Sequence, residues 1–156
     1  MKVIKGNLLD LAEQGEFDVI VHGCNCYNTM GSGIARQIRE RFPEAWMADQ
    51  ATPEGDVNKL GTISVAQDPT GRFLIVNAYT QYGFNRNGET ADVFEYTAFQ
   101  LILEKMLKRI PNNRFGFPMI GMGLAGGNKE RILAMLEDFS QKVEAEGGTV
   151  TLVEFE

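Results

Sequence analysis

The sequence predicts a single α/β domain in which a mixed sheet lies between two layers of helices. Short apolar runs alternate with segments of helical periodicity, the connections between them are short, and two glycine-rich turns each stand between a strand and a helix. The chain has 156 residues. That length suits one domain burying roughly 70% of its unfolded surface but not two ordinary ones. We therefore predict one domain over residues 1–156, a three-layer α/β/α sandwich.

Six segments are rich in β-branched and aromatic residues and have the length of strands. They are residues 2–5, 17–21, 60–66, 72–79, 114–120 and 149–155. Because helices are expected between most of them, these strands should be buried on both faces of the sheet. Ligands of such a fold bind beyond the carboxyl ends of the strands.

Four segments carry apolar residues at helical spacing. They run from about Gly33 to Pro43, over 43–51, from about Asp92 to Ile110, and from Asn128 to about Glu146. Pro43 ends the first helix and suits the start of the second. The two long helices each have one apolar face, as expected of helices that cover a sheet.

Composition excludes several classes of protein. Hydrophobic residues make up 44% of the chain, yet no apolar run approaches the length of a membrane span, and no secretory leader begins it. We expect a soluble, cytoplasmic protein without a membrane partner. The net charge is -6 and the basic residues are scattered, so an extended nucleic-acid partner is not expected. The sequence leaves the oligomeric state open.

The chain contains two cysteines and one histidine. Cys24 and Cys26 stand two positions apart, which is too close for the usual structural zinc pair, and we interpret them as free thiols. His22 alone cannot build a multi-histidine metal site. The acidic residues are dispersed, so we predict no metal and no cofactor.

Two glycine-rich segments leave a predicted strand and enter a predicted helix: HGCNCYNTMGSG, which starts at His22, and GMGLAGG, which starts at Gly121. Glycine permits a positive φ and close backbone approach, and a helix N-terminus offers unpaired N–H groups, so each segment is a plausible anion cradle. One such turn alone is often only a turn. Two at one edge of a sheet can hold a diphosphate from both sides. Neither matches a Walker A or a dinucleotide fingerprint, which disfavours a kinase or an ordinary dehydrogenase.

These residues also carry a resemblance to a known family. VHGCNC followed by MGSGIARQIRERFP, and later PMIGMGLAGG, resemble the two ligand loops of macro domains, the α/β/α modules that bind ADP-ribose. The pattern is most similar to the branch of ADP-ribose 1″-phosphate phosphatases and related phage and bacterial proteins. VIKGNLL and KLGTISV resemble that branch too, so the match covers most of the chain.

The resemblance implies a set of residues that bind ADP-ribose. Asn25 would contact the distal ribose, although an Asn there can also simply cap a turn. The first loop would wrap the ribose and diphosphate with Gly31, Ser32, Gly33 and Ile34, and the second would form the opposite wall with Gly121, Met122, Gly123, Leu124, Ala125 and Gly126. Fixed backbone amides would then neutralise the diphosphate.

Adenine would lie near Asn7 and Leu8. Family members commonly have an Asp where this chain has Asn7. Asn7 would accept through its amide oxygen, and the backbone N–H of Leu8 would donate to a ring nitrogen, with less assistance from charge. Tyr82 and Phe84 are candidate walls that stack on adenine or cover the distal ribose; packing beneath a loop is the alternative.

Removal of the 1″ phosphate would require a proton donor or acceptor, and His22 is the candidate for this role. A histidine buried below the pocket is the alternative interpretation. Asn28 and Gln81 are polar residues on the ligand loops that could orient water.

Macro domains of other kinds offer alternative activities. A lysine-dependent glycohydrolase is disfavoured, because residues 80–84 contain no Lys and Ala125 replaces the required Asp; Lys59 is interpreted as a surface charge. A non-catalytic ADP-ribose reader and an ester hydrolase acting through a bound water remain open.

Overall fold

The computed structural model describes residues 1–86 and 88–156. Six strands form one sheet in the order β1-β6-β5-β2-β4-β3. The strands are β1 (Lys2–Gly6), β2 (Val19–Cys24), β3 (Ile63–Gln67), β4 (Leu74–Tyr79), β5 (Arg114–Phe117) and β6 (Thr149–Phe155). All neighbouring strands pair in parallel except β3, which is antiparallel to β4. The sheet is therefore mixed, as predicted.

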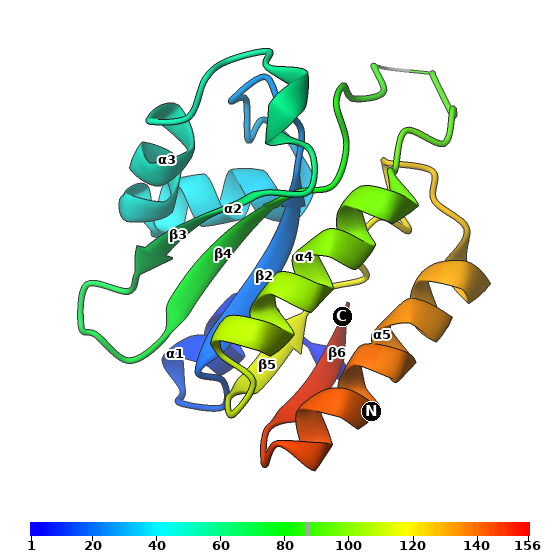
Figure 1. The fold of residues 1–156 in the computed structure, drawn as a ribbon. Coiled ribbons are helices and arrows are strands. Elements are labelled where there is room, and N and C mark those ends of the chain that lie inside the picture. Colours follow the sequence, from blue (N-terminus) through cyan, green and yellow to red (C-terminus); the bar gives the residue numbers. More distant parts are fainter. Residues whose placement is uncertain (87) are drawn as a thin grey trace.

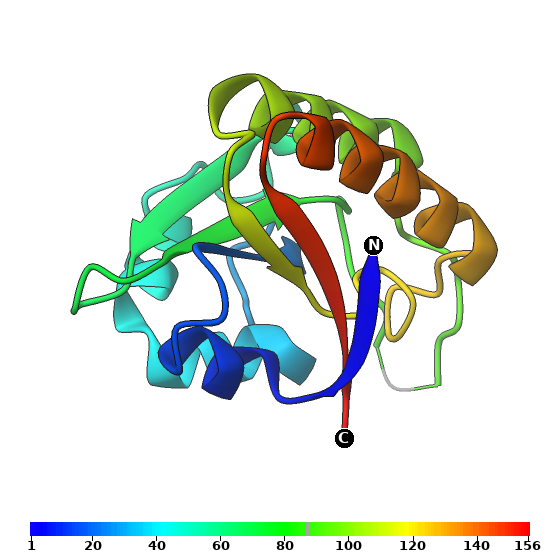
Figure 2. The ribbon, with the colours of Figure 1, turned by 90° about the horizontal axis from the view of Figure 1, so that it is seen from below.

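Helices cover both faces of this sheet. They are α1 (Leu8–Glu13), α2 (Gly33–Arg41), α3 (Pro43–Gln50), the short 3₁₀ helix η1 (Val57–Lys59), α4 (Tyr96–Arg109) and α5 (Lys129–Ala145). Figures 1 and 2 show α4 and α5 together on one face and α1, α2 and α3 on the other. The predicted three-layer α/β/α sandwich is confirmed.

The two faces of the sheet carry separate cores, because successive strand residues point to opposite sides. Val19 and Val21 pack with Phe99 of α4 on one side. Ile20, which lies between them in the sequence, packs with Leu9 of α1 on the other. Buried apolar area of this kind contributes most of the driving force for folding. It also holds the carboxyl ends of the central strands in fixed positions.

Several boundaries differ from the sequence prediction. Helices α1 and η1 were not predicted, since each is too short to show a helical period. Strand β2 continues through His22 to Cys24 rather than ending at residue 21. Helix α4 begins at Tyr96 and not near Asp92, whose side chain instead accepts a hydrogen bond from the Phe94 N–H. The first glycine-rich loop therefore begins at Asn25.

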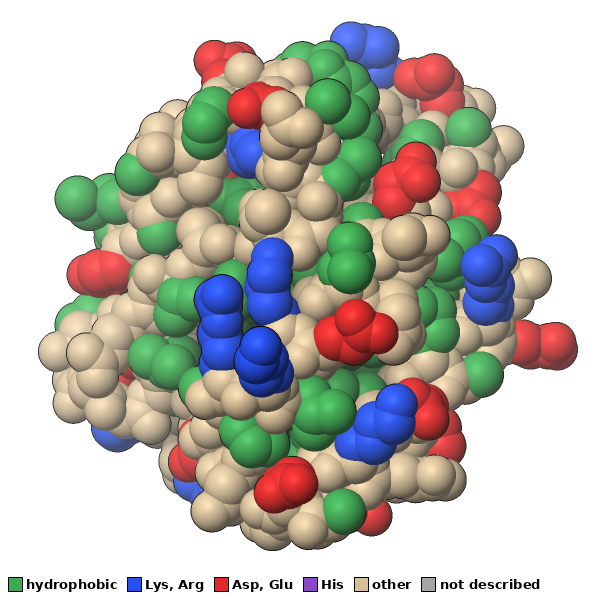
Figure 3. Space-filling model, viewed as in Figure 1, with side chains coloured by type: hydrophobic (Ala, Val, Ile, Leu, Met, Phe, Trp, Pro, Cys, Tyr) green, Lys and Arg blue, Asp and Glu red, His purple; other side chains and the backbone are tan. Residues whose placement is uncertain are grey.

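On the face shown in Figure 3, acidic side chains are spread over the surface, and several basic side chains lie together near its centre with acidic ones close by. Among the helices of the described residues, none combines the length and the apolar character that crossing a bilayer requires.

Candidate functional site

Strands β2 and β5 are neighbours in the middle of the sheet, and each leads into a glycine-rich loop. Their pairing covers only Val19 with Phe115 and Ile20 with Gly116. Beyond it, β5 ends at Phe117 and is followed by Pro118, which has no N–H to continue the ladder. The carboxyl edge of the sheet is consequently open between the two loops.

A cavity of about 620 Å³ lies at this opening. A second cavity of about 290 Å³ adjoins it, and the two share Gly33, Ile34, Pro118 and Met119 as walls. Both volumes fall near the range of small-molecule sites. Together they offer space for an elongated ligand made of two parts.

Most of the predicted ligand residues line these cavities. The larger cavity is lined by Asn25, Gly31, Ser32, Gly33, Ile34, Gln81, Phe84, Gly121, Gly123, Leu124 and Ala125. The smaller one is lined by Asn7, Leu8, Gly33 and Ile34. Among the described residues, Asn28, Tyr82, Met122, Gly126 and His22 line neither cavity. Contact of any of the predicted residues with a ligand, lining or not, stays a prediction.

Asn25 both lines the cavity and shapes its loop. Its Oδ1 accepts from the Tyr27 N–H at 2.8 Å, and its Nδ2 donates to Thr29 Oγ1 at 2.7 Å. Asn25 therefore does cap the turn of its own loop. Because the same side chain borders the larger cavity, capping also fixes the face that it presents there.

Ser32 is the N-cap residue of α2, but its hydroxyl makes no capping hydrogen bond. The first N–H groups of a helix lack intrahelical partners. Here that first turn, including Gly33 and Ile34, lines both cavities, so unpaired donors and the positive end of the helix dipole point toward the site. The Ser32 hydroxyl has no capping role and is therefore a further candidate to bind a ligand.

The second loop divides its backbone donors between the protein and the cavity. The N–H groups of Met122, Gly126 and Gly127 donate to Met119, Gly123 and Gly121 carbonyls at 2.8–3.1 Å. By contrast, the N–H groups of three residues find no acceptor within the described part of the chain: Gly123, Leu124 and Ala125. Those three line the larger cavity. The loop therefore keeps free donors on the side where an anion would lie.

Asn28 does not face the cavity. It has a positive φ of 58°, its Nδ2 donates to Thr52 O at 2.9 Å, and its Oδ1 accepts from the Lys59 ammonium. Lys59 is only 4% exposed and also donates to Cys26 O at 3.1 Å. The interpretation of Lys59 as a surface charge was wrong, because carbonyl and amide oxygens of the first loop enclose its ammonium. The hydrogen bonds of Asn28 and Lys59 therefore help to fix the conformation of the first loop.

The aromatic candidates separate into two roles. Phe84 is 40% exposed and lines the larger cavity, as does Gln81. Tyr82 is turned inward instead: its hydroxyl donates to Gly55 O at 2.8 Å, and its ring lies edge-on to Tyr27 at 5.1 Å. Phe84 therefore has the placement of a ligand wall, and Tyr82 that of a packing residue.

His22 is 0% exposed. Asn77 donates through Nδ2 to Ala45 O and Ser64 Oγ at 2.9 and 3.0 Å, so its Oδ1 must face His22. His22 Nε2 consequently carries the proton and donates to that oxygen at 2.6 Å. Burial lowers the pKa of His22 to about 4, against the Asn77 hydrogen bond, which raises it. This placement favours the structural interpretation of a neutral His22, and its catalytic role stays a prediction.

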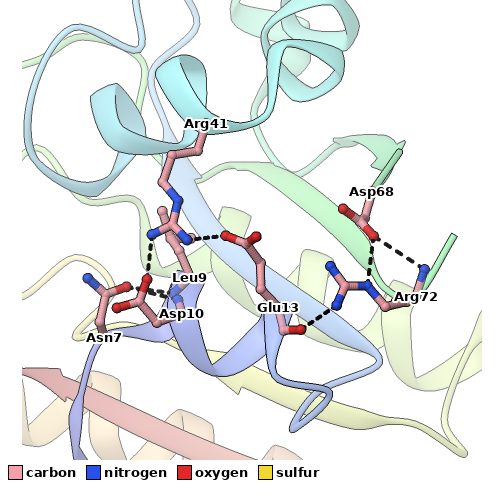
Figure 4. A network of polar contacts seen from close by, with 7 residues as sticks. All are labelled: Asn7, Leu9, Asp10, Glu13, Arg41, Asp68 and Arg72. Carbon is pink, nitrogen blue, oxygen red and sulfur yellow. Dashed lines mark hydrogen bonds and ion pairs between the residues drawn. The ribbon is translucent and has the colours of Figure 1, made fainter. Parts of the chain in front are cut away.

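Asn7 caps helix α1. Its Oδ1 accepts from the N–H groups of Leu9 and Asp10, both at 3.0 Å (Figure 4). A carboxamide oxygen has two lone pairs, and both are used here. The expectation that Asn7 accepts from adenine through this oxygen does not fit the structure, since the group left free is the Nδ2 donor. Arg41 of α2 binds Asp10 and Glu13 and fixes this helix (Figure 4).

Within the described part of the chain, three ionisable residues line the larger cavity: Cys24, Asp49 and Arg86. Sequence reasoning missed Asp49 and Arg86. Asp49 lies on α3 four positions after the buried Ala45, and no sequence signal indicated that it would border the cavity. Arg86 lies two residues after Phe84, and its guanidinium lies 5.6 Å from the Phe84 ring centroid. Cys24 and Cys26 are free thiols, as predicted.

Solved macro domains share this architecture. The macrodomain of Mycobacterium tuberculosis DarG superposes with a TM-score of 0.72 at 20% identity, covering 98% of each chain. A Trypanosoma brucei macrodomain in complex with ADP-ribose superposes with a TM-score of 0.67 at 14% identity, covering 98% of this chain and 62% of that one. At these identities the likeness concerns the fold, which is that of a macro domain.

Relatives in sequence define the family further. An uncharacterized 17.5 kDa protein from the tk-vs intergenic region of Enterobacteria phage T4 is 37% identical, over 92% of each chain. A Candida albicans protein named ADP-ribose 1″-phosphate phosphatase is 26% identical, over 89% of this chain and 93% of its own. No family model matches the sequence. The chain belongs to the macro domain family, in the branch that includes such phosphatases.

Proposed function

We propose that this protein binds ADP-ribose and hydrolyses the phosphate of ADP-ribose 1″-phosphate. The observation that carries the proposal is the pair of adjoining cavities with the shared walls Gly33 and Met119. The smaller cavity has room for a base. The larger one combines free backbone donors from both loops with space for a diphosphate, the distal ribose and its 1″ phosphate.

The donors in the larger cavity suit this anionic ligand. The first turn of α2 and the free N–H groups of Leu124 and Ala125 approach it from two sides. Fixed amides neutralise phosphate oxygens without requiring a basic protein, which is consistent with a net charge of -6. Arg86 adds a cation at the border of the cavity. Phosphoryl transfer depends mainly on such positioning and electrostatic stabilisation.

The relatives support the proposal. The solved Trypanosoma macrodomain holds ADP-ribose, and the Candida relative is named for its action on ADP-ribose 1″-phosphate. We expect phosphate release to continue in EDTA, because free backbone N–H groups at the larger cavity can stabilise phosphate oxygens. Complete loss of activity on chelation would contradict this expectation.

Calorimetric titration tests binding, and phosphate release tests turnover. ADP-ribose should bind much more tightly than AMP, because the larger cavity grips the distal half of the molecule. ADP separates the contribution of the diphosphate from that of the distal ribose. Release of inorganic phosphate from ADP-ribose 1″-phosphate should follow Michaelis–Menten kinetics. The absence of heat with ADP-ribose at any concentration would contradict the proposal.

A non-catalytic ADP-ribose reader is the second candidate. His22 favours it, because it lines neither cavity and its Nε2 is bonded to Asn77, so the one imidazole has no direct contact with a ligand. A reader would bind ADP-ribose as tightly as a phosphatase and would release no phosphate. The same pair of measurements therefore separates the two functions.

A further inference from the structure

Asp49 is the one carboxylate among the described residues that line the larger cavity. Asp49 belongs to α3 and is 1% exposed. Only one of its carboxylate oxygens has a partner in the part of the chain that the structure describes: Oδ1 accepts a hydrogen bond from the Tyr79 hydroxyl at 2.6 Å. Its Oδ2 is buried and has no hydrogen-bond partner in the described structure. Buried polar atoms are nearly always paired, so an unpaired carboxylate oxygen beside a cavity requires an explanation.

Nearby groups do not supply the missing partner. The Lys59 ammonium donates to Cys26 O and Asn28 Oδ1. The Thr52 hydroxyl donates to the backbone carbonyl of Asp49 at 2.6 Å, not to its carboxylate. Asp49 lines the larger cavity, so we infer that an occupant of this cavity supplies the missing partner of Oδ2.

A chain of hydrogen bonds fixes Asp49 from behind. The donor of each link is set by its neighbour: His22 donates to Asn77, Asn77 donates to Ser64, and Ser64 lies 2.9 Å from the Tyr79 hydroxyl, which donates to Asp49. Successive donors that point in one direction polarise one another. The Asn77 amide cannot pass a proton onward, so the chain orients Asp49 and leaves the proton chemistry to its carboxyl group.

We propose that Asp49 is the general acid for the phosphatase reaction, and that His22 is a positioning residue acting through Asn77, Ser64 and Tyr79. This inference rests on the proposed function. Phosphoryl transfer passes through a loose transition state in which charge builds on the leaving oxygen, so a proton delivered there has a large effect.

The reaction balances with water as the only co-reactant. The bond between phosphorus and the 1″ oxygen breaks, its electron pair goes to that oxygen, and the oxygen takes the proton of Asp49. A water oxygen bonds to phosphorus, and one proton of this water restores the Asp49 carboxyl group. ADP-ribose and hydrogen phosphate leave.

Burial raises the pKa of Asp49, against the hydrogen bond from Tyr79 and the charge of Lys59, which lower it. A raised pKa favours the protonated form that a general acid requires. The charged or titratable groups that influence this carboxyl come from three elements and the first loop: Tyr79 of β4, Lys59 of η1, Cys24 of β2 and Cys26. A phosphate dianion bound beside it would raise the pKa further.

The test is Asp49→Asn in the full chain, which keeps an oxygen for Tyr79 and removes the transferable proton. Asp56→Asn is the control, because Asp56 caps η1 and does not line the cavity. We expect Asp49→Asn to keep its melting temperature, to bind ADP-ribose within about threefold of wild type, and to release phosphate at least ~100-fold more slowly. Asp56→Asn should match wild type in all three.

The pH profile provides a second measurement. Wild-type kcat should fall as pH rises through the pKa of Asp49 in the complex, and this alkaline limb should be absent in Asp49→Asn. Wild-type rates in Asp49→Asn overturn the role of Asp49, and so does a loss of phosphate release that merely follows a loss of ADP-ribose affinity. If Asp49→Asn does not fold, the wild-type profile decides. A kcat that stays constant as pH rises overturns the role of Asp49. If wild type binds ADP-ribose but releases no phosphate, the proposed function itself is wrong.

Discussion

Gly31 and Gly33 of the loop after β2 have open space where a side chain would begin: the nearest atom to a Cβ at Gly31 is Thr29 O at 3.9 Å, and none lies within 4 Å at Gly33. In the loop after β5, a Cβ at Gly126 would lie 2.6 Å from Ala91 O, and one at Gly127 would lie 2.5 Å from Gly121 O. Gly31 leaves room beside the cavity, and Gly33 does so too, although its φ of 58° also favours glycine. In the second, most glycines are needed for the loop's own packing.

Gly123 is an exception within the second loop. A Cβ added there would have no atom within 4 Å, the residue lines the larger cavity, and its N–H has no acceptor in the described structure. Two loops that look alike in sequence therefore differ in what their glycines do. The distinction separates substitutions that unfold the protein from substitutions that only fill the site.

The largest expected effect is on stability. Gly126→Ala should lower the free energy of unfolding by about 3 kcal/mol, since Gly126 has a φ of 68° and the new methyl would meet the Ala91 carbonyl. Gly31→Ala should change it by less than about 1 kcal/mol. Urea denaturation of both variants measures the difference. Equal losses in the two variants would remove the contrast between the loops.

The strands that lead into the loops also differ. β2 carries the buried His22, whereas residues 115–120, which lead to the second loop, include no ionisable side chain. Burial lowers the pKa of His22 to about 4, from an ordinary value near 6.5. As pH falls from 6.5 to 4, the unfolded chain takes up a proton that the folded protein resists, so stability decreases across this window.

We expect this decrease to be about 3 kcal/mol and to be complete below pH 4. Urea midpoints measured from pH 7 to pH 4 for wild type and His22→Gln test it. The variant should lack this component of the pH dependence. A decrease of the same size in His22→Gln would assign the effect to carboxylates elsewhere in the chain.

The next effect concerns affinity. Gly31→Ala and Gly123→Ala both place a methyl group at the cavity from opposite loops, where a ligand's phosphates or ribose must approach the backbone closely. Each should weaken ADP-ribose binding by about tenfold, or ~1.4 kcal/mol, and leave the melting temperature unchanged. Calorimetry provides both a Kd and an enthalpy. Unchanged affinity in both variants would mean that neither loop touches the ligand.

The sequence predicted the layers, the strand regions and the positions of both loops, because these depend on local periodicity and on glycines that leave a strand. It did not predict the environments of Lys59 and Asp49. Lys59 stands in a polar segment and is buried only because the first loop folds over it. Asp49 becomes part of the cavity through the packing of α3 against the sheet, which no nearby residue in the sequence reveals.

Asn7 illustrates the same limit on a smaller scale. The expected loss of charge assistance stays a prediction, and the use of the Asn7 oxygen depends on where α1 begins. Since α1 starts at Leu8, the oxygen caps the helix and only the amide donor remains for a ligand. A residue type alone does not show which of its atoms is free.

The smallest expected effect concerns the smaller cavity, where Asn7 has only its amide donor left for a ligand. Asn7→Asp supplies two carboxylate oxygens, one to cap α1 and one to accept from the exocyclic amine of adenine. Because a charged acceptor makes the stronger hydrogen bond, ADP-ribose should bind about fivefold more tightly, or ~1 kcal/mol. Asn7→Ser is the matched control, because it keeps a capping oxygen but does not extend to the base. Equal affinities of the Asp and Ser variants would show that adenine does not rely on residue 7, and would place base recognition on the Leu8 backbone N–H alone.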